Sequence, residues 1–182
     1  YETVVGADGS AIRQGMVYVA DYTLSGDITD EAARVFVRSE LVEGELQIVT
    51  ETIEDSHGNI IQTVTRTMQY DGSRNLIGIL YEVKDSRDNV ITMLQFNVMS
   101  ITATVAGATI VRAEATKTND RGEPLTYKLE DEYSGEDKLM RSKYGLRHTL
   151  SDGTVRLSLV IKEYDTEGEL DALSLTGSSS TV

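Results

Sequence analysis

The side chains best suited to chemistry are two histidines and a few clusters of carboxylates. His57 falls inside a predicted turn, and His148 lies beside a basic segment. A Ser–His–acid catalytic site needs a histidine that contacts both a nucleophile and an orienting acid. The sequence has no G-x-S-x-G motif, and a histidine at the tip of a turn is usually exposed to solvent. Neither histidine is therefore assigned a catalytic role.

Neighbouring carboxylates occur at three places: Asp30 with Glu31; Glu130 with Asp131 and Glu132; and Glu136 with Asp137. Two carboxylates can hydrolyse a glycosidic bond. In a chain with 30 acidic residues such neighbours arise by chance, and the aromatic platforms that hold sugars are missing. We predict that the protein is not an enzyme and that it has no catalytic, cofactor-binding or metal-binding residues.

Two predicted turns carry several oxygen ligands. They read D-S-H-G-N from Asp55 and D-S-R-D-N from Asp85, and such oxygens could hold Ca²⁺ weakly. The same side chains can instead accept hydrogen bonds from the backbone of their own turn, which is the interpretation we favour. The sequence lacks a phosphate-binding loop, a dinucleotide fingerprint and an EF-hand loop. With no cysteine, disulfides, thiolate zinc sites and cysteine nucleophiles are excluded.

Composition excludes several further classes of protein. The net charge of −13 argues against nucleic-acid binding, which requires clustered lysine and arginine. No apolar run approaches the roughly 20 residues of a membrane-spanning helix, so no transmembrane segment is expected. An apolar fraction of 40% and a single proline indicate a folded chain. Its length is that of a single domain covering residues 1–182.

Four turns share a pattern that opens on Asp or Asn and reaches Gly or Asp three residues later. They begin at Asp55, Asp85, Asn119 and Asp165, and each lies between β-prone segments. We predict hairpins with a type I turn followed by a left-handed residue. Together with Tyr70-Asp71-Gly72 and Tyr164-Asp165, these turns resemble the tyrosine–aspartate repeats of large bacterial surface and toxin shells. The resemblance covers the turns alone, and no function is taken from it.

The hairpin over residues 76–99 is the most apolar part of the chain. Both faces of its strands are largely apolar, so we predict that it lies centrally or is covered on both faces. Other segments alternate between apolar and polar residues, which is typical of half-buried antiparallel strands. The residues expected on inner faces include Leu125, Tyr127, Leu129, Val155, Leu157, Leu159 and Ile161.

These patterns predict an all-β fold: an antiparallel, hairpin-rich sandwich or open barrel with at most one short helix near residues 29–34. Residues 1–15 are interpreted as an extended N-terminal arm or donor strand, and residues 175–182 as a small polar tail. Residues 130–148 have the least regular pattern and are interpreted as a solvated connection, with a binding loop as the alternative.

The leading functional hypothesis is a secreted or cell-surface structural protein that self-associates as a filament, sheath or surface-layer subunit. Terminal β-prone segments motivate it, because such a segment can add a strand to a neighbour's exposed sheet edge. The expected partner is another copy of the chain. The alternative is a carrier of a lipid or other apolar ligand within a curved sheet, in an envelope compartment. Both hypotheses place the protein at the cell surface, outside the cell or in the periplasm.

Overall fold

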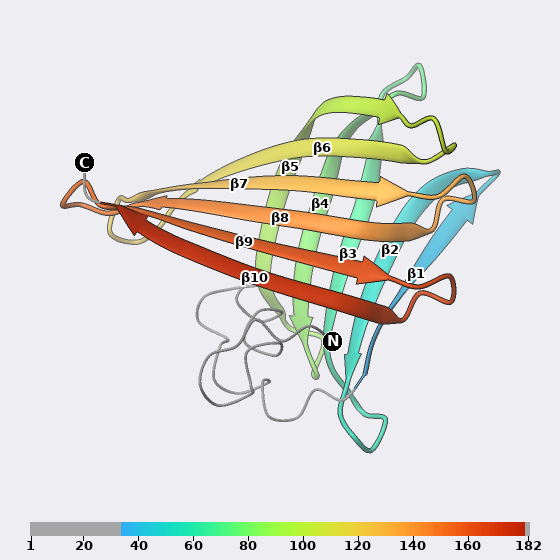
Figure 1. Ribbon diagram of the computed structural model, residues 1–182, viewed down its shortest axis with the longest axis horizontal. Coiled ribbons are helices and arrows are strands. Elements are labelled where there is room, and N and C mark those ends of the chain that lie inside the picture. Colours follow the sequence, from blue (N-terminus) through green and yellow to red (C-terminus); the bar gives the residue numbers. More distant parts are fainter. Residues whose placement is uncertain (1–33, 181–182) are drawn as a thin grey trace.

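Residues 34–180 form a single antiparallel sheet of ten strands paired in sequence order (Figure 1). A computed structural model describes residues 34–180 of the chain. The strands are β1 (Arg34–Val42), β2 (Glu45–Glu54), β3 (Ile60–Tyr70), β4 (Leu76–Asp85), β5 (Val90–Ala103), β6 (Thr109–Thr118), β7 (Pro124–Tyr133), β8 (Leu139–Thr149), β9 (Val155–Tyr164) and β10 (Leu170–Ser180).

The sheet curls until β1 returns to β10, which gives a nearly closed barrel. In Figure 1, strands β7–β10 cross in front of β2–β5 at a steep angle, and the core lies between these two layers. At the closure, Phe36 and Glu169 form an isolated bridge, and the Val37 amide donates to the Gly168 carbonyl at 2.7 Å. The prediction of an all-β, hairpin-rich open barrel or sandwich is confirmed.

The expectations for the two ends of the chain have different outcomes. No helix occurs among residues 34–180, and Arg34 already belongs to β1. Residues 29–33, where the short helix was expected, and the arm at residues 1–15 lie outside the described residues. Residues 175–180 of the expected polar tail form the second half of β10, where they pair with β9.

Eight of the nine hairpin connections use one turn geometry. The amide of the first turn residue donates to the carbonyl of the fifth, and the amide of the fourth donates back to the first. The fourth residue has a positive φ in every case, as predicted for a type I turn with a left-handed residue. The turns open at Asp55, Asp71, Asp85, Thr104, Asn119, Ser134, Leu150 and Asp165. The recurring turn is the local reason that the chain meanders back and forth.

Gly168, the fourth residue of the last turn, contacts Val37 of β1 where the barrel closes. Its φ is 86°, and a Cβ atom there would lie 2.3 Å from the Val37 carbonyl oxygen. Gly153 occupies the equivalent turn position with φ 84°, and a Cβ atom there would meet nothing within 4 Å. An alanine at position 153 therefore adds only the energetic cost of a positive φ, whereas an alanine at position 168 adds a steric clash with β1 as well.

We expect Gly153→Ala to lower the free energy of unfolding by about 1–2 kcal/mol, from the backbone conformation alone. Gly168→Ala should lose about 1–3 kcal/mol more, because its methyl group overpacks against β1. Urea denaturation of both variants measures the difference. Equal losses would mean that the contact between Gly168 and Val37 does not constrain the barrel.

The core is built from the inward faces of the strands. In the β4–β5 hairpin, Ile79, Tyr81 and Phe96 are at most 1% exposed, and these strands lie in the middle of the strand order, as predicted. On the opposite face, Met93 is 54% exposed and Met99 63% exposed. Of the two alternatives in the prediction, the central position is therefore the one that holds, because these two side chains leave the outer face uncovered.

The predicted inward face of β7 is confirmed, because Leu125, Tyr127 and Leu129 are all buried. In β9 the prediction is wrong beyond Val155. Ser158 and Lys162 are buried, whereas Leu157 is 47% exposed. Both faces of β9 carry apolar side chains, so a period of two residues cannot decide which face is inside.

Residues 130–148 do not form a solvated connection. They contain the end of β7, a five-residue turn and nearly all of β8. Charged residues hid the pattern, because Lys143 and Arg147 alternate with the buried Tyr144 and Leu146. The segment is therefore a regular half-buried strand pair.

Candidate functional site

The first candidate site is the seam where the barrel fails to close completely. Strand β10 pairs with β9 over its whole length, but among residues 34–180 it meets β1 only around Phe36 and Val37. Near this point Arg34 donates to the Glu169 carboxylate and lies 3.6 Å from Glu54. Beyond it, the backbone of β10 from residue 172 onward pairs with no described strand other than β9. Such an edge offers unpaired amides and carbonyls to another chain.

Inside the barrel, two buried ion pairs connect the two layers. Arg66 of β3 donates to Asp131 of β7 at 2.8 Å, and Lys162 of β9 donates to Glu51 of β2 at 2.7 Å. The side chains of all four are at most 4% exposed. Glu51 also accepts a hydrogen bond from the Tyr164 hydroxyl. These contacts join strands that share no backbone pairing.

Neighbouring opposite charges favour the ionised forms of Glu51 and Arg66 despite their burial. Burial alone would raise the pKa of Glu51, but the charges of Lys162 and Arg66 and two hydrogen bonds outweigh burial and lower it. For Arg66, burial disfavours the charged form, and the Asp131 carboxylate outweighs it so that the pKa rises well above its usual range. Breaking either pair would leave an uncompensated charge in a medium of low dielectric constant.

Sequence reasoning missed this network, although a signal was present. Arg66 has the same parity in β3 as Val64 and Met68, and Glu51 has the same parity in β2 as Val49 and Ile53. A charged residue on an apolar strand face indicates a buried partner. The partner itself could not be found from the sequence, because Arg66 and Asp131 are 65 residues apart.

The centre of the barrel is filled by aromatic rings. Tyr81 lies 5.9 Å from Phe96 and 5.8 Å from Tyr144, measured between ring centroids, and Tyr127 lies 5.9 Å from Tyr144. These rings come from β4, β5, β7 and β8, so both layers contribute. At these spacings the rings attract one another and occupy the space that a ligand inside the barrel would need.

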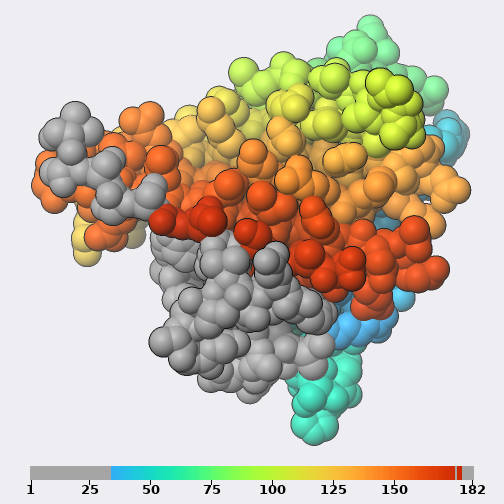
Figure 2. All heavy atoms as spheres, viewed as in Figure 1, coloured from blue at the N-terminus to red at the C-terminus, as the bar shows by residue number. Residues whose placement is uncertain are grey.

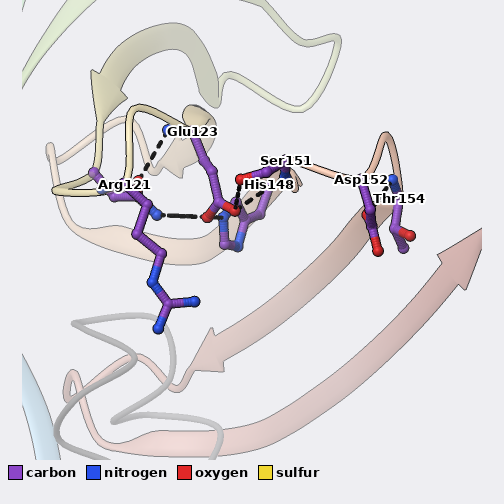
Figure 3. A network of polar contacts seen from close by, with 7 residues as sticks. Arg121, Glu123, His148, Ser151, Asp152 and Thr154 are labelled. Atoms are coloured by element: carbon purple, nitrogen blue, oxygen red, sulfur yellow. Dashed lines mark hydrogen bonds and ion pairs between the residues drawn. The ribbon is translucent and has the colours of Figure 1, made fainter.

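His148 belongs to a polar cluster that links two turns at one end of the barrel (Figure 3). Glu123 accepts hydrogen bonds from the Ser151 hydroxyl at 2.7 Å and from the Asn119 side chain at 2.9 Å, and its Oε2 lies 2.9 Å from His148 Nε2. The carboxylate stands between serine and histidine. A catalytic triad has the histidine between the other two, so this arrangement clamps turns together and does not activate a nucleophile.

These hydrogen bonds, first those from Asn119 and Ser151 and then the one with His148, lower the pKa of Glu123 to about 2. Because the folded pKa lies below the ordinary value of 4.5, this carboxylate stabilises the fold above that value. The stabilisation is lost as the pH falls towards 2. We expect Glu123→Gln to have a lower urea midpoint than the wild type at pH 7, with the difference shrinking between pH 5 and pH 2. A difference that stays constant over this range would contradict the assignment.

The turns considered for Ca²⁺ use their carboxylates internally. Asp55 accepts hydrogen bonds from the amides of His57 and Asn59, and Asp85 accepts them from those of Arg87 and Asn89. His57 is exposed at its turn. The part of the chain that the structure describes has no group of three or more His, Asp or Glu side chains placed to bind a metal ion.

The carboxylate clusters are also dispersed. Asp131 is buried inside the barrel, whereas Glu130 pairs with Arg112 on the outer face. Glu136 and Asp137 lie in the turn between β7 and β8, and Asp30 and Glu31 lie outside the described residues.

No helix between residues 34 and 180 is long and apolar enough to cross a membrane.

No family model, curated protein or solved structure matches the chain.

Proposed function

We propose that the protein is a structural subunit of the cell surface or the extracellular space that self-associates by strand pairing at the free edge of β10. The observation that carries the proposal is the seam. Among the described residues, β10 pairs fully on one side and touches β1 only near Gly168 on the other. A second copy can continue the sheet there through backbone hydrogen bonds, a common mode of strand addition.

The composition of the edge supports the same proposal. Natural proteins protect exposed edges with charged residues and proline. From Leu173 to Ser180, β10 reads L-S-L-T-G-S-S-S and contains neither. Among residues 34–180 the outer edge of β1 pairs only at Phe36 and Val37. Because β1 carries Arg34, Arg38 and Glu40, it is the better protected of the two edges. Pairing of β10 in one copy with β1 in the next is heterologous, and it generates an open filament when the rotation between copies does not close a ring.

Because the chain has no cysteine, a single introduced cysteine can be labelled selectively to test the proposed association surface. Thr176→Cys places a thiol on β10, and Thr116→Cys places a matched thiol on β6, which is paired on both sides. Both threonines are exposed. We expect the wild-type chain to form concentration-dependent assemblies in sedimentation velocity and filaments in negative-stain microscopy. A bulky maleimide at position 176 should abolish the assemblies, and the same group at position 116 should leave them intact.

Two results would overturn the proposal. One is a full-length chain that stays monomeric at all accessible concentrations. The other is an assembly that tolerates the bulky group at position 176, because the association surface would then lie elsewhere. Fractionation of cells that produce the protein tests the proposed location outside the cytoplasm.

A further inference from the structure

A hollow on the outer face of the front layer has the features of a binding site. It encloses about 670 Å³ over β6–β10, and a second hollow of about 320 Å³ adjoins it. Both are lined by Glu114, Lys128, Gly145 and Leu159. Strands β8–β10, in orange and red, lie in front on the face shown in Figure 2. A volume of this size suits a small organic ligand.

The hollow exists because a glycine stands where a side chain would project. Strand register aligns Lys128, Gly145 and Leu159 in one row across β7, β8 and β9. Glycine in a strand interior generally weakens the sheet. The backbone does not require it here, because a Cβ atom at Gly145 would meet its nearest neighbours at 3.9 Å, an ordinary contact distance. Gly145 therefore provides space on the surface.

The rim of the hollow is cationic, although the whole chain carries a net charge of −13. Lys128 lies 3.6 Å from Glu114, and Arg112 lies 2.8 Å from Glu130. Arg147 lines the larger hollow and Lys143 the smaller one, and within residues 34–180 neither forms an ion pair. Each hollow thus has one cation available for an external anion, and an arginine binds a carboxylate or phosphate through paired hydrogen bonds.

The remaining walls are apolar. Leu157 and Leu159 of β9 line the larger hollow, and Met99 of β5 lines the smaller one. Leu157 is 47% exposed and Met99 63% exposed, so apolar area is left for a ligand to cover. A free inorganic ion would use the cations but would leave this apolar surface in water.

We propose that this outer hollow binds an amphiphilic anion, a carboxylate or phosphate attached to an aliphatic chain. The head group pairs with Arg147, which lines the larger hollow, and the chain lies over Gly145 against the leucines of β9. This site is on the outside of the barrel, and its lining extends from β6 to Thr176 and Gly177 of β10, the last strand of the sheet. Its ligand could be a free fatty acid or the head-group region of a single-chain lipid, since both share this chemistry.

Calorimetric titration of the full chain with decyl phosphate, below its micelle concentration, tests the proposal. Decanoate serves as the carboxylate counterpart, inorganic phosphate tests charge alone, and decanol tests the chain alone. We expect saturable binding of one decyl phosphate or decanoate per chain, and affinities at least about tenfold weaker for the other two probes. Lysophospholipid in place of decyl phosphate distinguishes a lipid head group from a free acid.

Matched variants locate the site. Gly145→Leu fills the hollow and should weaken binding at least about tenfold, while thermal unfolding shows that the variant remains folded. Arg147→Gln should weaken binding about tenfold, and Arg156→Gln, an exposed arginine of β9 outside the lining, should change nothing. Three results would overturn the proposal: no saturable binding, equal affinity for inorganic phosphate, or binding unaffected by Gly145→Leu. Loss of self-association in Gly145→Leu with binding retained would assign the hollow to an interface and would also overturn it.

Discussion

Replacing Arg66 by methionine is expected to lower the free energy of unfolding by about 3–5 kcal/mol. The substitution removes the partner of Asp131, whose side chain is completely buried, and also removes the hydrogen bond to Ser142 and the contact with the Tyr81 ring. The Tyr133 hydroxyl, 3.3 Å from Asp131, would remain as a neutral donor. Urea denaturation at pH 7 measures the loss.

A surface pair provides the matched control. Arg112 lies 2.8 Å from Glu130, the same separation as in the buried pair, but its side chain is 44% exposed. Exposed pairs contribute little, so Arg112→Met should cost less than about 1 kcal/mol. A similar small loss for Arg66→Met would show that water reaches Asp131 in solution.

The double variant Arg66→Met with Asp131→Leu separates charge from packing. Within the described residues, Arg66 Nη1 and Asp131 Oδ1 have no hydrogen-bond partner, so the pair is incompletely satisfied. Replacing both members by apolar side chains should recover most of the stability lost in the single variant, to within about 1–2 kcal/mol of the wild type. Additive losses would contradict the view that the uncompensated charge causes the damage.

The second large effect is expected from Lys162→Met, at about 3–5 kcal/mol near pH 7. This substitution leaves the carboxylate of Glu51 buried between the layers with the Tyr164 hydroxyl and the more distant charge of Arg66. The matched control is Lys128→Met, whose lysine is 71% exposed and lies 3.6 Å from Glu114. That variant should lose less than about 1 kcal/mol.

The free energy of unfolding of Lys162→Met should change with pH in the direction opposite to that of the wild type. In the wild type the pKa of Glu51 lies below its ordinary value of 4.5, so its contribution is present above that value and is lost as the pH falls further. Without Lys162, burial is the largest remaining influence on Glu51, and we expect its pKa to rise above the ordinary value. The variant is then most stable at low pH and weakens as the pH rises.

The difference in unfolding free energy between wild type and Lys162→Met should therefore be largest at pH 7 and shrink towards pH 4. Denaturation curves at pH 4, 5, 6 and 7 measure it. A difference independent of pH would show that lost packing, and not the buried carboxylate, destabilises the variant. The variant Lys162→Met with Glu51→Leu should lose this pH dependence.

Local sequence patterns determine where the strands and most of the turns occur. The Asp or Asn that opens the turns at 55, 85, 119 and 165 accepts amide hydrogen bonds within five residues, and a later residue tolerates positive φ. Such contacts are complete within the turn and need no distant partner. The turns opened by Thr104, Ser134 and Leu150 were missed because they lack an Asp or Asn in the first position.

Two features depend on the tertiary structure alone. They are which face of a strand with two apolar faces is buried, and which charged side chains form ion pairs. A period of two residues separates the faces of β9, but Lys162 is inside because curvature of the sheet places β9 opposite Glu51, 111 residues away. The same curvature brings Gly168 to Val37 and leaves the rest of the β10 edge without a described partner. Closure of a barrel depends on twist accumulated over all ten strands. No single segment carries that information, so neither the seam nor the buried ion pairs could be predicted from local patterns.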